Sequence, residues 1–233
     1  MWLIDTATFH LTEFTLDAQR PKYAILSHRW IEGEEVTFQE MRSNGLPPDR
    51  SEISQCCKLA RAEGIAYAWV DTCCIDKTSS AELTEAINSM YHWYADSEIC
   101  YAYLADVHVQ ESSTLTKSSW FTRGWTLQEL IAPEQVLFYD HGWTPLGSRS
   151  DLSWELSYIT GIAEAVLAQQ KAVNFCSIAE RMSWASRRTT TRKEDMAYGL
   201  LGLFQVNMPM LYGEGGERAF LRLQEEIIKS SDD

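Results

Sequence analysis

Four short apolar runs, separated by segments with helical spacing, constrain the fold of this 233-residue chain more than any other feature. The runs lie at 23–27, 66–71, 99–104 and 135–139. Uninterrupted apolar runs of this length are typical of strands buried on both faces, and strands that alternate with helices form parallel sheets. The sequence therefore predicts an α/β fold with a mostly parallel sheet flanked by helices.

Helical patterns fill the gaps between these runs. Apolar residues recur at helical spacing over 53–60 and, behind a Ser-x-x-Glu capping box, over 79–94. A polar loop over 111–119 then leads into a third helix, which is predicted to run without a break over 120–131 and to end before Pro133.

The patterns change in the second part of the chain. Beyond Asp140 we expect no further strand, because the apolar residues there follow helical spacing only. Capping boxes at 177–180 and at 191–194 predict two helix starts, and a last helix carries apolar residues over 219–228. This part is therefore predicted to be a mainly helical extension.

No linker or internal repeat divides the chain, so we predict one domain over 1–233. It consists of an α/β core over 1–140 and a helical extension over 141–233 packed on that core. A formal net charge of −13 argues against a nucleic-acid polymer as partner. There is no run of about 20 apolar residues and no leader-like start, so we expect a cytoplasmic protein without a membrane span.

The cysteines give no sign of a metal centre or of a disulfide framework. Two adjacent pairs do not have the C-x-x-C spacing of zinc sites. We expect reduced, mostly buried thiols and no metal; the six residues are Cys56, Cys57, Cys73, Cys74, Cys100 and Cys176.

Polar and aromatic side chains follow the predicted strands at 27–30, 71–77 and 123–129. Ligands of open α/β sheets bind beyond the carboxyl ends of the strands, so we expect these segments on one rim. If 123–129 is helical, Trp125 and Glu129 lie one above the other on one face. The candidate site residues are Ser27, His28, Arg29, Trp30, Asp71, Cys73, Asp76, Lys77, Arg123, Trp125 and Glu129.

Two other interpretations fit the same residues less well. Asp71 at a strand end suggests a phosphoacceptor or a metal ligand, but Ser27 and His28 stand where an acidic pair is needed. Ser27 beside His28 suggests a nucleophile and its base, but adjacent residues of an extended segment point to opposite faces. We therefore expect Asp71 to orient its loop as a hydrogen-bond acceptor.

Three blocks stand in a fixed order: YAILSHRW at 23–30, WVDTCCIDK at 69–77 and RGWTLQE at 123–129. Together they resemble the heterokaryon-incompatibility (HET) domain of filamentous fungi. The segment MPMLYGEG at 208–215 and the last helix resemble the region beyond these blocks in HET domains fused to NACHT-type proteins. The chain departs from the common pattern at Ile31, where glycine is usual, and at Lys77, where glutamine is frequent.

This resemblance implies a fold similar to Toll/interleukin-1 receptor (TIR) domains, which is flavodoxin-like. It also implies a role in fungal non-self recognition and programmed cell death, a form of innate immunity, with self-association and a NACHT-type domain downstream. Many TIR domains cleave NAD at the nicotinamide–ribose bond with a helix glutamate that follows the third strand. The matching residue is Glu129, so the resemblance implies an NAD hydrolase with NAD as substrate and no cofactor.

The expected chemistry needs a single carboxylate. Cleavage builds oxocarbenium charge on the ribose, which Glu129 would stabilise, while nicotinamide leaves as a neutral base without a general acid. Trp125 is expected to stack on the pyridinium ring, and Arg29 and Lys77 to pair with the pyrophosphate.

Three hypotheses remain open from the sequence. The first is an NAD-cleaving death effector that works when clustered. The second is a non-enzymatic, TIR-like assembly module that recruits partners, and the third is a domain that binds a nucleotide without cleaving it. They differ at Glu129, because only the enzyme requires its carboxylate.

Overall fold

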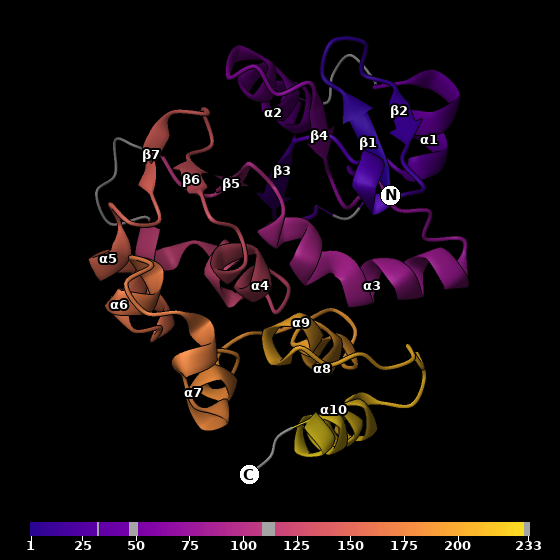
Figure 1. Ribbon diagram of the computed structural model, residues 1–233. Coiled ribbons are helices and arrows are strands. Elements are labelled where there is room, and N and C mark those ends of the chain that lie inside the picture. Colours follow the sequence, from indigo (N-terminus) through magenta and orange to yellow (C-terminus); the bar gives the residue numbers. More distant parts are fainter. Residues whose placement is uncertain (32, 47–50, 109–114, 231–233) are drawn as a thin grey trace.

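A seven-stranded mixed sheet forms the centre of the computed structural model, which describes residues 1–31, 33–46, 51–108 and 115–230 (Figure 1). The strands lie in the order β2-β1-β4-β3-β5-β6-β7. Their bounds are β1 Trp2–Asp5, β2 Leu11–Glu13, β3 Tyr23–His28, β4 Tyr67–Trp69, β5 Ile99–Tyr103, β6 Val136–Tyr139 and β7 Pro145–Ser148.

Strands β4, β3, β5 and β6 pair in parallel and form the core of the sheet. Every residue of β3 and β5 is buried, as expected for parallel strands covered on both faces. Along the chain, these four strands occupy the order second, first, third, fourth. The direction of winding therefore reverses between β3 and β5, and crevices for ligands form at such reversals.

All four strands predicted from apolar runs are confirmed, but three strands at the edges were missed. Strands β1 and β2 pair antiparallel before β4, and β7 pairs antiparallel with β6. The expectation of no strand beyond Asp140 is therefore wrong. The cause is that these strands have only three or four residues each. Strands β2 and β7 also have no fully buried residue, and the apolar run of β1 is too short to mark a strand by itself.

Helices cover both faces of the sheet, with α2 above it and α3 and α4 below it in the view of Figure 1. The C-terminal helices form a further layer beneath α3. The bounds are α1 Phe38–Asn44, α2 Ser51–Ala62, α3 Ser80–Ala95, α4 Thr126–Ile131, α5 Ser153–Thr160, α6 Glu164–Leu167, α7 Ile178–Ser183, α8 Asp195–Tyr198, α9 Leu201–Phe204 and α10 Gly216–Ser230; short 3-10 turns are η1 Asp17–Gln19, η2 Leu115–Lys117, η3 Ser119–Thr122 and η4 Val173–Phe175.

The predicted helix over 120–131 is wrong as a continuous element. It is divided into η3 and α4 by an extended residue, Arg123. Gly124 N donates to Thr189 O at 2.8 Å, and Thr189 N donates to Thr122 O at 2.7 Å. These bonds join the break to a segment far along the chain. The loop predicted before it falls partly on 109–114, outside the described residues.

Two of the three predicted capping boxes place a helix start correctly. Ser79 caps α3 and Ser177 caps α7, each accepting a hydrogen bond from the backbone N–H three residues later. The third is wrong, because α8 begins only at Asp195. There the Glu194 carboxylate instead accepts from the N–H groups of Gly213 and Gly215, at 3.0 and 3.1 Å.

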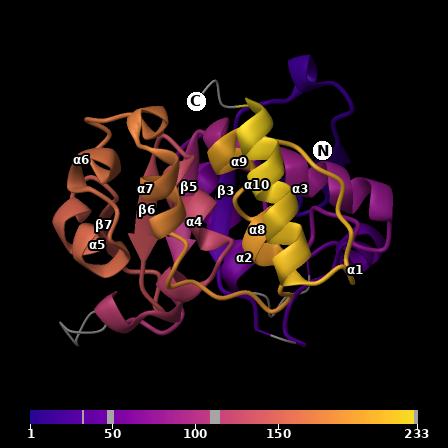
Figure 2. The same cartoon turned by 90° about the horizontal axis from the view of Figure 1, so that it is seen from below.

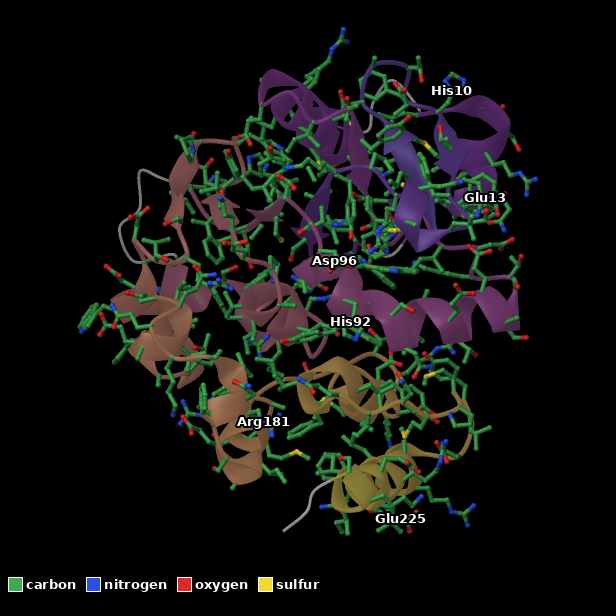
Figure 3. All side chains as sticks on the ribbon, in the orientation of Figure 1. His10, Glu13, His92, Asp96, Arg181 and Glu225 are labelled. Carbon is green, nitrogen blue, oxygen red and sulfur yellow. The ribbon has the colours of Figure 1, made fainter. Side chains whose placement is uncertain are left out.

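The C-terminal helices pack on α3 without room between them. A Cβ added to Gly202 of α9 would lie 2.0 Å from Cβ of Tyr91 on α3, so only glycine permits this contact. Arg181 of α7 donates to Leu203 O at 2.8 Å (Figure 3). Helix α10 lies in front of α9 in the view of Figure 2. It buries Ala219 and Leu223, whereas Ile228, expected in the same apolar stripe, is exposed.

Two further properties concern the whole described chain. All six cysteines are free and buried. Across the described ranges, no helix combines the length and the apolar character that crossing a bilayer demands.

Candidate functional site

A buried carboxyl group lies where the winding of the sheet reverses. Glu129 belongs to α4, which packs against β3, and its side chain is almost completely buried. The hydroxyl of Ser27, near the carboxyl end of β3, donates a hydrogen bond to Glu129 Oε2. Trp120 Nε1 in turn donates to Ser27 Oγ at 2.9 Å. This chain of hydrogen bonds fixes the position of the carboxyl group.

The surroundings of Glu129 favour its protonated form. Burial and, after it, the negative charge of Asp71 raise the pKa of Glu129 to about 7. The hydrogen bond from Ser27 and the positive charges of Arg123 and His28 act in the opposite direction. A carboxyl group with this pKa exists in both protonation states near neutral pH, a property frequent at functional sites.

An aromatic ring with two cations near it contacts Asp71, the residue whose charge acts on Glu129. Trp30 Nε1 donates to both carboxylate oxygens of Asp71, at 3.2 and 3.0 Å. Lys77 Nζ lies 3.8 Å from the centroid of the Trp30 ring, and Arg123 Cζ lies 5.5 Å from it. The first, second and third sequence blocks therefore meet at Trp30, and Asp71 accepts a hydrogen bond as expected.

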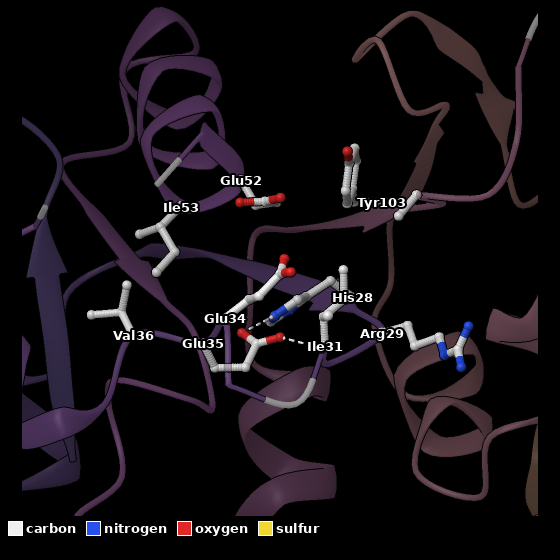
Figure 4. Close-up of a pocket in the computed structure, with 10 residues that line it drawn as sticks. His28, Arg29, Ile31, Glu34, Glu35, Val36, Glu52, Ile53 and Tyr103 are labelled. Carbon is white, nitrogen blue, oxygen red and sulfur yellow. Dashed lines mark hydrogen bonds and ion pairs between the residues drawn. The ribbon is translucent and has the colours of Figure 1, made fainter. Parts of the chain in front are cut away.

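A small acidic hollow lies on the other side of the same strand end (Figure 4). It is lined by His28, Glu34, Glu35, Glu52 and Tyr103, among others, and its water-accessible space is about 40 Å³. That is room for about three water molecules. Glu129 does not line this hollow. Because its side chain is almost completely buried, a dinucleotide reaches Glu129 only if neighbouring residues move.

His28 connects the hollow with the buried carboxyl group. Its Nε2 lies 3.0 Å from Glu35 Oε2. Burial opposes protonation of His28, but the hydrogen bond to Glu35 and nearby carboxylates raise its pKa above the ordinary value. Burial alone would raise the pKa of Glu35, but the hydrogen bonds from His28 and the Ile31 backbone, together with the positive charges of His28 and Lys77, lower it below the ordinary value.

Three other predicted residues have different surroundings. Arg29 donates to Ser119 Oγ at 3.0 Å, and its guanidinium points away from the carboxylates of the hollow (Figure 4). Cys73 is buried in the turn after β4. Asp76 accepts from Thr78 N and Oγ1 ahead of α3.

Trp125 faces the C-terminal helices. Its Nε1 donates to Asp195 Oδ2 at 3.3 Å, and a Cβ added to Gly199 would lie 3.6 Å from its ring. It begins α4 as the N-cap, while the Glu129 carboxyl group contacts Ser27 on the sheet side. The ring that contacts Asp71, whose charge acts on Glu129, is that of Trp30.

The structure thus brings seven predicted residues into one connected set: Ser27, His28, Trp30, Asp71, Lys77, Arg123 and Glu129. Sequence reasoning missed Trp120, Glu35 and the buried Arg188. Trp120 could have been identified from the sequence, because it lies in the predicted helix shortly before the block at 123–129. Arg188 could not, because no feature of the local sequence links it to Glu129.

The arrangement is suited to stabilising positive charge. It offers one carboxyl group that ionises near neutral pH, held in a low-dielectric interior where electrostatic interactions are strong. Within the described part of the chain, no cluster of three or more His, Cys, Asp or Glu side chains is arranged to hold a metal ion.

The fold and this site define an α/β protein with a single buried glutamate at the reversal point of its sheet. The model of the family described as "Heterokaryon incompatibility protein (HET)" matches residues 23–117. The chain is also 43% identical over 221 residues to "Vegetative incompatibility protein HET-E-1" of Podospora anserina. The chain belongs to the heterokaryon-incompatibility (HET) family.

The match to the Podospora relative covers 90% of this chain and 16% of that protein. The similarity to this relative thus extends well beyond residues 23–117, which the family model matches, and covers the part of the chain that contains Glu129. No solved structure matches the chain.

Proposed function

We propose that this chain is a cell-death effector domain of heterokaryon incompatibility, which cleaves NAD at the nicotinamide–ribose bond when several copies cluster. Its similarity to a protein named for vegetative incompatibility supports the biological role. The observation that carries the enzymatic part is the buried Glu129 carboxyl group, hydrogen-bonded to Ser27 where the sheet reverses.

In this proposal the ionised Glu129 stabilises the positive charge that develops on the ribose as the bond to nicotinamide breaks. Nicotinamide takes both electrons of that bond and leaves as a neutral base. Water then adds to the ribose and loses a proton, which gives ADP-ribose. The Trp30 ring with Lys77 and Arg123 beside it offers cations for the pyrophosphate.

A TIR-like fold is part of the proposal. The four parallel strands lie in the order second, first, third, fourth, which corresponds to the first part of the flavodoxin-like order. A cytoplasmic location, expected from the sequence, is also part of the proposal. A NACHT-type domain in the full-length protein completes the assignment, because it follows from the family resemblance.

The need for clustering is supported by how closed the site is. Glu129 is almost fully buried, and the adjacent hollow has room only for a few waters. Binding NAD therefore requires residues around Glu129 to move apart, which costs free energy in an isolated copy. Neighbouring copies that stabilise the open arrangement raise its population and with it the rate per chain.

The test is to incubate the chain with NAD, alone and fused to an oligomerising coiled coil, and to measure released nicotinamide per chain. The fused chain is expected to cleave NAD at a rate that far exceeds that of the dilute chain. Fused and unfused chains that both leave NAD intact would contradict the enzymatic assignment.

A non-enzymatic assembly module is the second candidate, favoured by one surface feature. Trp154 and Tyr158 are stacked one turn apart on α5 and are 66% and 77% exposed. Exposed aromatic residues are enriched where proteins associate. This candidate predicts that clustered chains kill cells while cellular NAD stays constant, and that E129Q kills as well as the unchanged chain.

A further inference from the structure

Helix α4, which carries Glu129, is held at both ends by buried arginines. At its N-terminal end Arg188 Nη1 donates to Arg123 O and to Thr126 Oγ1, both at 2.8 Å. Arg188 Nε donates to Trp184 O at 3.3 Å. The guanidinium therefore joins the end of α7 to the first turn of α4.

At the C-terminal end Arg149 makes the corresponding contacts. Its Nη1 donates to Leu130 O at 2.6 Å and to Ile131 O at 3.2 Å, and its Nη2 donates to Glu134 O at 3.1 Å. Carbonyl groups at a helix C-terminus lack partners within the helix, so this arginine acts as a cap.

The two arginines differ in the charge that they face. Thr126, which Arg188 contacts, precedes Glu129 by three residues and so lies on the same side of the helix. Burial lowers the pKa of Arg188 to about 10, and Glu129 is the charge that partly restores it. Arg188 thus stays protonated at neutral pH, and its Nη2 has no hydrogen-bond partner among the described residues.

Among the described residues, Nε of Arg149 likewise has no hydrogen-bond partner. The titratable groups that act on the charge of Arg149 are Cys100 and Tyr91, and neither is a carboxylate. Two buried guanidinium groups therefore hold one short helix, and only one of them interacts with its carboxyl group. This difference provides a matched pair for experiment.

Several charged or titratable groups act on Glu129 from the surrounding elements. Asp71, Arg123 and His28 shift the pKa of Glu129 most, and the charge of Glu129 in turn acts on Tyr94, Cys100 and Arg188. These six residues belong to β3, the loop after β4, α3, β5, the break before α4 and the segment after α7. Among the cations, Arg188 alone is both buried and bonded to α4 itself.

We propose that Arg188 is a positioning residue for Glu129: its guanidinium fixes the first turn of α4 and supplies buried positive charge that favours the ionised carboxyl group. The catalytic consequence rests on the proposed function, whereas the electrostatic link does not. By this inference, a residue from the C-terminal helical region contributes to the position and ionisation of the carboxyl group in the sheet region.

The first test compares R188Q with R149Q by following the Glu129 side-chain carboxyl carbon in NMR titrations, with E129Q identifying the signal. R188Q removes the charge but keeps a donor for Arg123 O. We expect it to raise the pKa of Glu129 by more than R149Q does, since removing an opposite charge disfavours the ionised carboxyl group. R149Q should leave the pKa within a few tenths of a unit while costing similar stability.

The second test uses the unchanged protein and so does not depend on the folding of a variant. The guanidinium nitrogen signals of Arg188 are expected to shift with pH at the midpoint of Glu129, and E129Q should abolish that shift. The signals of Arg149 are expected to stay constant over the same range.

An Arg188 signal that does not respond while Glu129 titrates would overturn the proposal. Equal pKa shifts in R188Q and R149Q would do the same, because a purely structural role predicts no difference between them. Neither measurement involves NAD, so failure of the enzymatic assignment is distinguishable from failure of this inference.

Discussion

At the scale of single residues, Glu129 has the clearest effect on how stability depends on pH, because its carboxyl group is buried where a negative charge is unfavourable. Its pKa in the folded chain is about 7, against an ordinary value of 4.5. The folded state thus binds the proton more tightly than the unfolded state. The resulting stability is fully present below about pH 4.5 and is lost as the pH rises through about 7, an effect of about 3 kcal/mol.

E129Q should remove this pH dependence, because an amide resembles the protonated acid in shape and does not ionise. We expect the variant to unfold at nearly the same urea concentration as the unchanged chain at pH 5 and at a clearly higher one at pH 8. Urea titrations at several pH values between these two measure this. Parallel stability curves for the two proteins would show that Glu129 is ionised throughout.

Ser27 makes a second prediction at this scale. S27A deletes the donor to Glu129 and leaves Trp120 Nε1 buried without its acceptor, so we expect a loss of about 1–3 kcal/mol. The pKa of Glu129 should also rise. S97A is the control, because Ser97 is a buried serine that donates to Tyr94 O and has no contact with Glu129. Carboxyl NMR titrations that give S27A and S97A the same Glu129 pKa would contradict this role of Ser27.

At the scale of elements, the break between η3 and α4 determines where Glu129 points. A Cβ added to Gly124 would lie 2.4 Å from Cγ2 of Thr190. G124A should therefore cost about 1–3 kcal/mol by overpacking. T190S removes that methyl group, so the double variant G124A/T190S should regain much of the loss. A double-mutant cycle by thermal unfolding tests this, and strictly additive effects would argue against the contact.

The same elements show which features the sequence could and could not predict. The core strands were predictable because burial on both faces leaves a continuous apolar run, as in β3 and β5. The break at Gly124 was not, because an isolated glycine inside a helical pattern is tolerated. The conformation there is decided by pairing with Thr189, far along the chain.

For the candidate site, the sequence predicted which residues follow the core strands but not how every side chain is oriented. Strand ends place Ser27 and Asp71 on one rim, because the carboxyl ends of parallel strands share an edge. Arg123 instead lies in the break between η3 and α4. The orientation of Trp125 toward Asp195 was not predictable, since it depends on how the C-terminal helices pack.

At the scale of the whole molecule, the C-terminal helices are part of the structure that holds the site. Gly202 packs against Cβ of Tyr91, which the α3 backbone fixes in place. G202A should therefore destabilise the chain by about 2 kcal/mol or more and expose 184–230 to proteases first. G142A is the control, because its added Cβ would make contacts no closer than 3.5 Å. Equal protease resistance of the two variants would contradict this packing.

The most direct test of the central claim measures nicotinamide release and cell killing by coiled-coil fusions of the unchanged chain, E129Q and E134Q. Glu134 is an exposed glutamate shortly beyond Glu129 and serves as the matched control. We expect E134Q to match the unchanged chain, and E129Q to remain folded while losing at least about 100-fold in NAD cleavage, with killing lost as well. A folded E129Q that releases nicotinamide and kills at the unchanged rate would contradict the assignment of Glu129 as the catalytic residue.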